Sequence, residues 1–309
     1  MSRLGAPERR ELADRFGERV RFDQPLAPFT SWKIGGPADA LIAIESTDEV
    51  AFVLRLCVRR GVAWFVLGSG SNLLVGDGGM RGIVLRLGGE YASLAVDAAS
   101  EPRTVLVRAG AAASLSLLTA QAASAGARGI GSLAGVPGSV GGALRMNAGT
   151  DREMGDFVRD VWIQTPSKPD AHAITPQYYY RRTSLARDAI VAHVTLAFER
   201  GEPAEVRTEM QRRLVRRKET QPLQFPNAGS CFRNPEGNHA GRLIEEVGAK
   251  GWRVGGAEVS RLHANFIVNV DGATAQDVTT LLARVRRAVH DRFAVDLELE
   301  VHLVGEFTA

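Results

Sequence analysis

Apolar and polar residues alternate along the chain in short blocks, and this pattern predicts helices and strands in mixed order. Helical patterns open on a capping residue at Ser46, where Glu49 follows three positions later, and again at Ser114 and Thr274. The expected strands cover residues 40–44, 63–67, 83–87, 104–109, 161–164, 190–198, 264–270 and 295–304, and the expected helices cover 46–59, 114–124, 202–218, 241–247 and 274–293.

This mixture, with hairpin-like spacing in places, favours an α+β fold over a regularly wound parallel sheet. The 309 residues are enough for two or three domains that each bury a core. The charged helix near residues 202–218 has the character of a connector. We therefore expect a helical extension over residues 1–21, a first domain over 22–200 made of two subdomains that divide near residue 88, and a second domain over 201–309.

The composition is that of an ordinary water-soluble protein, with 45% hydrophobic and 24% charged residues. No stretch approaches the roughly 20 apolar residues that cross a bilayer, and the charged N-terminus lacks the apolar core of a signal peptide. We expect no membrane contact and a cytoplasmic location. The two cysteines, Cys57 and Cys231, form neither a disulfide framework nor a metal motif, so no metal is expected.

Arginine dominates the basic residues, since only four of the 38 are lysines. The planar arginine fork suits phosphates and carboxylates, which favours anionic ligands. A compositional bias of the genome explains the same excess equally well. No basic run is interleaved with aromatic residues, so we expect no nucleic-acid groove.

Two glycine-rich segments stand out. The first, Leu67-Gly-Ser-Gly-Ser-Asn72, directly follows an expected strand, and its small residues allow consecutive backbone amides to approach an anion. It matches neither the dinucleotide fingerprint nor the P-loop, and taken alone it could be a plain exposed turn. The second, residues 129–143 with Asn147-Ala148-Gly149 after it, has apolar residues placed regularly among the glycines. We expect that segment to pack against the core while it presents backbone to a flat ring and a diphosphate, and we expect the two segments to lie on neighbouring strands.

The chain resembles a known enzyme family at these segments. Ser31-Trp-Lys-Ile-Gly-Gly-Pro-Ala38 is similar to the entry of the FAD-binding (PCMH-type) domain of vanillyl-alcohol oxidase-type flavoenzymes. With Gly68–Asn72 and Ala134–Gly142, it resembles the UDP-N-acetylenolpyruvoylglucosamine reductases over roughly residues 22–306. The resemblance implies an FAD-binding domain of two subdomains, followed by a C-terminal α+β substrate-binding domain.

The resemblance also implies the cofactors. FAD would bind without a covalent bond, because no histidine follows the first glycine segment, and NADPH would be the co-substrate. The reaction would be reduction of UDP-N-acetylglucosamine enolpyruvate to UDP-N-acetylmuramate, a step in peptidoglycan precursor synthesis. The implied FAD-binding residues are Gly68, Ser69, Gly70, Ser71, Asn72, Leu73, Ala134, Gly135, Val136, Pro137, Gly138, Gly141, Gly142, Asn147, Ala148 and Gly149.

Three residues resemble the catalytic residues of the family: Arg181, Ser230 and Glu300. Arginine and a protonated glutamic acid would stabilise the negative charge that builds on the substrate, and the serine would donate the last proton. Lys218 and Asn234 resemble residues that contact the diphosphate sugar of the substrate.

Several assignments stay open at this point. A shift of one residue would make Arg182 the active-site arginine in place of Arg181, and Cys231 could be a second acid beside Ser230. His263 is expected to pack or to line the rim of the site, and Tyr178 and Tyr179 have no assigned role.

The resemblance leaves two rival functions. One is a flavin oxidase that passes electrons to oxygen, and the other is an arginine-rich nucleotide- or RNA-binding protein. The short span between Phe198 and Ser230 indicates the family subtype without an extra tyrosine-bearing loop over the substrate. The expected partner is a small nucleotide sugar, and a monomer is expected rather than an obligate oligomer.

Overall fold

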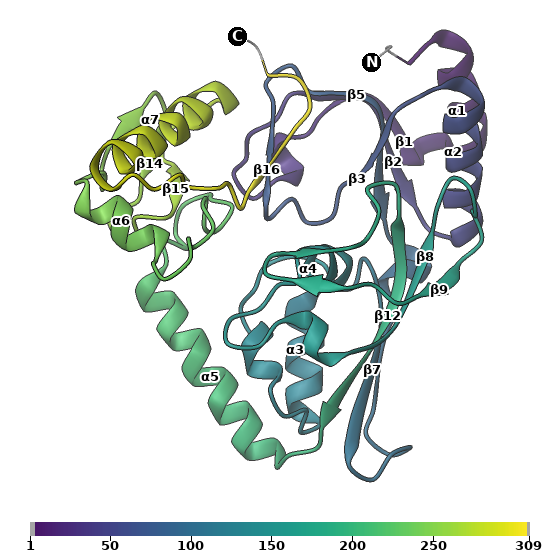
Figure 1. Cartoon of the computed structure of the whole chain (residues 1–309). Coiled ribbons are helices and arrows are strands. Elements are labelled where there is room, and N and C mark those ends of the chain that lie inside the picture. The colour runs from purple at the N-terminus through teal and green to yellow at the C-terminus, as the bar shows by residue number, and fades with distance from the viewer. Residues whose placement is uncertain (1–3, 308–309) are drawn as a thin grey trace.

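The computed structural model describes residues 4–307. Figure 1 shows two sheets packed together with their helices, and a long helix, α5 (Pro203–Thr220), that leads from them to a separate group of helices and short strands. The chain then returns from that group to the first sheet region at its C-terminal end.

The first sheet has the strand order β1 (Val20–Pro25), β2 (Pro37–Ile44), β5 (Met80–Leu87), β3 (Trp64–Val66). Strand β1 is antiparallel to β2, and the other pairs are parallel. Helices α1 (Ala6–Phe16) and α2 (Thr47–Arg60) cover it, with their apolar faces in the core. Helix α2 begins as expected, because the Ser46 hydroxyl accepts a hydrogen bond from the Glu49 amide at 3.3 Å.

The second sheet is antiparallel throughout, in the order β6 (Leu94–Asp97), β7 (Thr104–Gly110), β12 (Ile190–Glu199), β8 (Val158–Gln164), β9 (His172–Ile174). Helices α3 (Leu115–Ser124) and α4 (Val140–Arg145) lie against it. One hydrophobic cluster joins the two sheets, since it includes Ile42 and Leu85 of the first and Val107 and Leu196 of the second.

Helix α5 leads to a unit with its own core. This unit holds α6 (Ala240–Glu246), the antiparallel strands β13 (Arg253–Val254), β14 (Ala257–Val259) and β15 (Ile267–Asn269), and α7 (Ala275–Phe293). Trp32 of the first domain is fully buried in this second core, and its Nε1 donates a hydrogen bond to the Ile267 carbonyl at 2.8 Å. The two units are therefore joined by packed apolar surface as well as by α5.

The prediction of one closing strand over 295–304 is wrong in its length. The structure forms a strand only at β16 (His302–Val304), which pairs in parallel with β4 (Leu73–Val75) of the first domain. Residues 295–301 have the alternation of a strand because Leu297 and Val301 are buried, yet only an isolated bridge between Phe232 and Leu299 pairs this segment.

The other expected helices and strands are confirmed, with their ends moved by a few residues. Two-residue strands β10 (Tyr178–Tyr179) and β11 (Arg182–Thr183), which the sequence did not predict, form a hairpin. None of the helices within residues 4–307 has the length and the apolar character needed to cross a bilayer. Short 3-10 helices cover Gly17–Arg19, Ala27–Phe29, Gly89–Ala92, Ile130–Leu133 and Met154–Phe157.

Candidate active site

The first glycine segment is a turn that leads from β3 to β4. The backbone amides of residues 68–72 donate no hydrogen bond to any acceptor within residues 4–307. Gly70 has a positive φ of 61°, and a Cβ there would lie 2.4 Å from the Phe29 carbonyl oxygen. Only glycine permits this close approach. The turn therefore presents consecutive unpaired backbone amides, and the backbone of Phe29 packs against it at Gly70. An anion-binding turn has this arrangement of amides.

The second segment is more ordered than the sequence indicated. Ile130 and Leu133 lie in a 3-10 helix and are fully buried, and Val140 opens helix α4, where the Ser139 hydroxyl accepts from the Gly142 amide at 3.3 Å. The expected packing against the core is confirmed. The expectation that both segments follow neighbouring strands is wrong, because this one follows helix α3.

The two segments meet in space and form what we call the glycine cradle, residues 68–73 and 134–142. The Ser71 hydroxyl donates a hydrogen bond to the Pro137 carbonyl at 3.1 Å. A Cβ at Gly138 would lie 2.9 Å from Ser71 Oγ, and a Cβ at Gly68 would lie 2.9 Å from Ser139 Oγ. Surfaces of free amides and small residues at this junction suit the diphosphate and the flat ring of FAD.

Asn147, Ala148 and Gly149 support a neighbouring turn. The Asn147 side chain is buried, and its Nδ2 donates to Glu153 Oε2 at 2.5 Å and to the Tyr179 carbonyl at 3.1 Å. A Cβ at Gly149 would lie 2.0 Å from the Arg152 carbonyl oxygen. The structure therefore places these residues beneath the 149–155 turn, and their contact with FAD stays a prediction.

Arg181 and Glu300 form the centre of the site. Arg181 lies in the turn of the β10–β11 hairpin with a φ of +56°, a backbone conformation that is uncommon for a residue with a side chain. Its Nε donates to Glu300 Oε1 at 3.1 Å, although the two residues are 119 positions apart. Both side chains are 18% exposed, so the pair is largely buried but still reachable.

A backbone hydrogen bond connects the segment that carries Ser230 to Glu300. The Glu300 amide donates to the carbonyl of Cys231, the residue next to Ser230, at 2.8 Å. Asn72 of the glycine cradle donates from Nδ2 to the Glu300 carbonyl at 3.1 Å. Ser230 is half-buried, and its hydroxyl makes no hydrogen bond within the described chain. The structure thus brings Arg181 and Glu300 together beside the cradle and places Ser230 next in sequence to a residue that bonds Glu300.

Burial raises the pKa of Glu300 above the usual value for glutamate, while Arg181 and Arg233 act in the opposite direction and Glu153 adds to the rise. Removal of the carboxyl group from water disfavours its charged form. A glutamic acid of this kind can stay protonated and can donate a hydrogen bond or a proton. It is therefore suited to charge that develops on a bound carboxylate substrate.

The geometry favours Arg181 over Arg182 as the arginine of the site. The Arg182 guanidinium is exposed and lies over the Tyr179 ring, 4.9 Å from its centre. Ser184 accepts a hydrogen bond from the Gln177 amide at 2.8 Å and so closes the base of the hairpin. Cys231 is almost fully buried, and burial raises the pKa of its thiol to about 12, which disfavours it as the acid.

The two expected substrate contacts lie at the edge of this region. Lys218 is exposed in the last turn of α5. Asn234 Oδ1 accepts a hydrogen bond from the Ala240 amide at 3.0 Å, and this bond helps to begin α6. His263 packs against Phe266 with ring centres 4.8 Å apart. Contacts of Lys218 and Asn234 with substrate stay predictions.

Sequence reasoning missed three residues that the structure places at the site. Glu153 pairs with Arg181, and Arg217 lies against Gly135 of the glycine cradle, where burial lowers its pKa. The Tyr178 ring lies on Gly155, where a Cβ would be 2.4 Å from the ring. Glu153 closely follows Asn147-Ala-Gly149, which the resemblance assigns to FAD binding. This closeness in sequence was the one indication that Glu153 could belong to the site.

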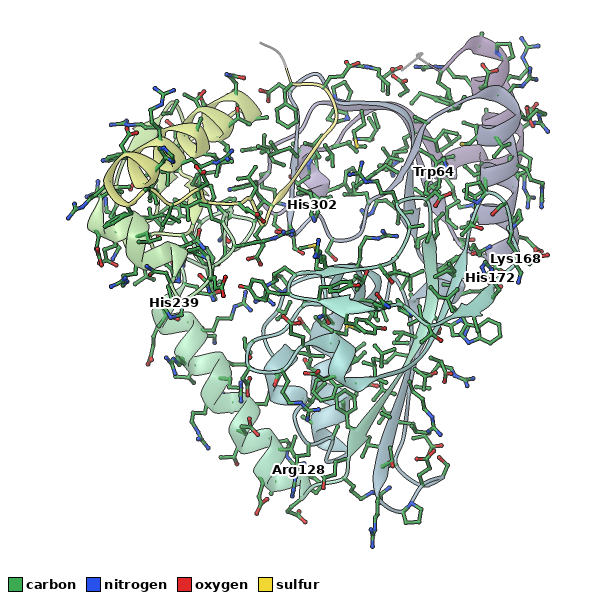
Figure 2. All side chains as sticks on the ribbon, in the orientation of Figure 1. Trp64, Arg128, Lys168, His172, His239 and His302 are labelled. Atoms are coloured by element: carbon green, nitrogen blue, oxygen red, sulfur yellow. The ribbon has the colours of Figure 1, made fainter. Side chains whose placement is uncertain are left out.

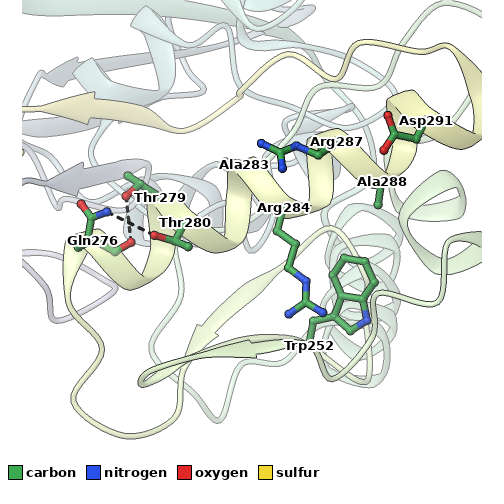
Figure 3. A pocket seen from close by; sticks show the side chains of 9 residues that line it. All are labelled: Trp252, Gln276, Thr279, Thr280, Ala283, Arg284, Arg287, Ala288 and Asp291. Atoms are coloured by element: carbon green, nitrogen blue, oxygen red, sulfur yellow. Dashed lines mark hydrogen bonds between the residues drawn. The ribbon is translucent and has the colours of Figure 1, made fainter. Parts of the chain in front are cut away.

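A surface hollow of 570 Å³ lies elsewhere, along the outer face of α7. Figure 3 shows that Arg284 lies over the Trp252 ring there, 4.2 Å from its centre, and that Gln276 and Thr280 are hydrogen-bonded. No residue of the glycine cradle or of the Arg181–Glu300 pair lines this hollow. We therefore place the functional site at the cradle.

Figure 2 shows His302, two residues after Glu300, between the C-terminal unit and the two sheets.

Family models match both halves of the chain. Residues 38–166 match an FAD binding domain, and residues 221–304 match the C-terminal domain of UDP-N-acetylenolpyruvoylglucosamine reductase. The expected FAD-binding domain is confirmed by this match. The fold and the site define an FAD-dependent oxidoreductase.

Full-length relatives identify the family. The chain is 46% identical over 293 residues to UDP-N-acetylenolpyruvoylglucosamine reductase 2 of Symbiobacterium thermophilum, covering 93% of this chain and 92% of that protein. It is 43% identical to the Moorella thermoacetica reductase, with 93% and 94% covered. The crystal structure of the Thermus caldophilus reductase matches at 36% identity with a TM-score of 0.78, covering 92% and 99%. The chain belongs to the UDP-N-acetylenolpyruvoylglucosamine reductase family.

Proposed function

We propose that this enzyme uses NADPH and FAD to reduce UDP-N-acetylglucosamine enolpyruvate to UDP-N-acetylmuramate in peptidoglycan precursor synthesis. The observation that carries the proposal is the junction at Glu300. Its side chain bonds Arg181, its amide bonds the residue after Ser230, and its carbonyl bonds Asn72 of the glycine cradle. This junction supports a site in which an acid, a cation and the Ser230 hydroxyl act beside the expected cofactor.

The glycine cradle would hold FAD through the free amides of residues 68–72 and through the close-packed backbone near Gly138. FAD held there would supply the hydride-transfer chemistry between NADPH and the methylene carbon of the enolpyruvyl ether. No histidine follows the first segment, so we propose that the cofactor is dissociable.

The three side chains act on the substrate. As the methylene carbon becomes a methyl group, negative charge builds on the carbon that bears the carboxylate. Arg181 and protonated Glu300 stabilise this charge, which is larger in the transition state than in the ground state. Ser230 donates its hydroxyl proton to that carbon and completes the product. A weak acid is sufficient because the enolate is a strong base.

Substrate position follows from the same arrangement. We propose that Lys218 and Asn234 contact the diphosphate-sugar part, at the edge of the C-terminal unit, while the enolpyruvyl group reaches Arg181.

In this proposal residues 22–200 form the FAD-binding domain, divided near residue 88, and residues 201–309 form the substrate-binding domain. We also propose a monomer with a cytoplasmic location and without a nucleic-acid partner.

Anaerobic half-reactions test the proposal directly. The purified holoenzyme is reduced with NADPH, UDP-N-acetylglucosamine enolpyruvate is added, and the return of oxidised flavin absorbance is followed in time. We expect rapid reoxidation and UDP-N-acetylmuramate as the product. Reoxidation by oxygen alone, without any effect of the enolpyruvyl nucleotide, would instead indicate a flavin oxidase. A colourless protein that binds no FAD would contradict the proposal altogether.

A further inference from the structure

We propose that Glu153 is a positioning residue that holds the Arg181 guanidinium against Glu300 and keeps it aimed at the substrate. The inference rests on the proposed roles of Arg181 and Glu300. It adds to the site a residue that does not itself act on the substrate, in contrast to Arg181, Ser230 and Glu300. Glu153 belongs to the turn that follows Asn147-Ala-Gly149, far in sequence from both partners.

Two glutamic acid side chains share the Arg181 guanidinium. Nη1 donates to Glu153 Oε1 at 3.2 Å, and Nε donates to Glu300 Oε1 at 3.1 Å. The Tyr180 ring lies under the guanidinium, 4.9 Å away. No acceptor within residues 4–307 bonds Nη2. The two acids and the ring therefore fix the orientation of the guanidinium, and one amine stays available for an incoming carboxylate.

Glu153 is itself held from three directions. Its Oε2 accepts from Asn147 Nδ2 at 2.5 Å, and its backbone amide donates to Asp156 Oδ2 at 2.9 Å. Asn147 Oδ1 in turn accepts from the Gly155 amide at 2.8 Å. The absence of a side chain at Gly149 lets the Glu153 backbone approach closely. An exposed surface ion pair has no such scaffold and contributes little, whereas this carboxylate is only 24% exposed.

The backbone conformation and the long side chain of Arg181 explain why these supporting contacts are needed. A residue with a side chain at a φ of +56° is held there by its surroundings. A long flexible arginine on a two-stranded hairpin would otherwise sample several rotamers, and a misplacement of about 1 Å at a reacting group can cost about 10²-fold in rate. Asn147 links the parts, because it bonds Glu153 through Nδ2 and also bonds the Tyr179 carbonyl of the same hairpin.

Glu153 also acts on Glu300 through its charge. The groups that act on the Glu300 carboxyl are Arg181 and Arg233, which lower its pKa, and Glu153, which raises it together with burial; the Cys231 thiol also faces it. The pKa of Glu153 is itself raised, first by burial and also by Asp156, against the effect of Arg181. Loss of the Glu153 charge should lower the pKa of Glu300, so that Glu300 deprotonates at lower pH.

The test compares Glu153→Gln and Glu153→Ala with a control from the same loop, Asp151→Asn. Asp151 pairs with Arg213 at 2.6 Å and makes no contact with Arg181. For each holoenzyme, reduction by NADPH and reoxidation by UDP-N-acetylglucosamine enolpyruvate are measured separately by stopped flow over a range of pH and substrate concentration. We expect Asp151→Asn to match the wild type in both half-reactions.

For Glu153→Gln we expect reduction by NADPH within about 3-fold of the wild type and saturating reoxidation slowed by about 10-fold, with the basic limb of its pH profile moved to lower pH. Glu153→Ala should slow reoxidation by about 10²-fold. Equal slowing of both half-reactions in Glu153→Gln would indicate a purely structural role and overturn the inference. Should Glu153→Ala fail to retain FAD, the isosteric Glu153→Gln decides the matter.

The design separates two failures. Wild-type reoxidation by the enolpyruvyl nucleotide, together with slow reoxidation in Arg181→Ala and wild-type rates in both Glu153 variants, would reject the role of Glu153 and leave the proposed function intact. A wild-type enzyme that the nucleotide does not reoxidise would reject the proposed function itself.

Discussion

Asn72 and Glu300 are 228 positions apart, yet Asn72 Nδ2 donates a hydrogen bond to the Glu300 carbonyl at 3.1 Å. The bond joins the glycine cradle to the segment that carries the candidate acid. Beside it, the His302 amide donates to the Asn72 carbonyl at 3.0 Å. The expected cofactor turn and the expected acid are therefore parts of one hydrogen-bonded ladder, and a shift of either moves the other.

We expect Ser230→Ala to be reduced by NADPH at the normal rate and to lose reoxidation by substrate by about 10²–10⁴-fold, the usual effect of one positioned acid. Stopped-flow absorbance of the flavin measures both steps. Cys231→Ala provides the comparison, since its thiol is buried next to Ser230. Loss of reoxidation in Cys231→Ala with a normal Ser230→Ala would reassign the acid to the cysteine.

The two adjacent arginines should differ sharply. We expect Arg181→Ala to slow reoxidation by at least about 10²-fold, because it removes a charge aimed at the developing negative charge. Arg182→Ala should stay within about 3-fold, since Arg182 is exposed and contacts only the Tyr179 ring among the interactions found in residues 4–307. The reverse order of effects would show that Arg182 is the active-site arginine.

The pH dependence of reoxidation should report Glu300. Its pKa is raised by burial, and the proposed role needs the protonated form. The rate should therefore be full below this raised pKa and should fall as the pH rises through it. Glu300→Gln should be slower and should lack that limb of the profile. An identical limb in Glu300→Gln would assign the titration to another group.

FAD affinity should depend on the absence of a side chain at Gly138. Its φ of +126° is strained for alanine, and a Cβ 2.9 Å from Ser71 Oγ would force the Ser71 hydroxyl to move. We expect Gly138→Ala to weaken FAD binding by at least about 10-fold, measured by titration of the apoprotein. The control is Gly272→Ala, since Gly272 also has a positive φ, of 57°, but nothing lies within 4 Å. Equal affinity in the two variants would remove Gly138 from the cofactor site.

Trp32 should carry much of the stability of the contact between the domains. Its side chain is fully buried and donates to the Ile267 carbonyl, and the Trp32 carbonyl accepts a hydrogen bond from Asn269 Nδ2 at 3.0 Å. We expect Trp32→Ala to reduce the free energy of unfolding by about 3–5 kcal/mol. Urea unfolding measures this, with the more exposed Trp162→Ala as a control. A loss below about 1 kcal/mol would contradict the role.

Much of the fold followed from local pattern. The Ser46 and Thr274 caps and the apolar runs of β5 and β12 depend on near neighbours in sequence, so the sequence alone predicted them. The strand over 295–304 was predicted too long, and its pairing with β4 escaped prediction, because β4 is more than 220 residues away and nothing local indicates it. The β10–β11 hairpin was missed because two-residue strands have no measurable period.

The candidate site shows the same division. Arg181, Ser230 and Glu300 were recognised through the family resemblance, since each alone reads as an ordinary surface or turn residue. Glu153 was missed because its role depends on a partner 28 positions away that is held in an unusual backbone conformation. Only coordinates reveal that both acids share one guanidinium.

The return of the chain at β16 means that the C-terminal unit is attached at both ends, through α5 and through the edge strand beside β4. Together with the buried contact of Trp32, these two connections hold the C-terminal unit against the first domain. Glu300 lies two residues before β16, and its backbone bonds both Cys231 of the C-terminal unit and Asn72 of the glycine cradle. A chimera that exchanges residues 201–309 therefore has to keep a C-terminal strand that pairs with β4. Without this pairing, we expect Glu300 to lose its position beside Arg181.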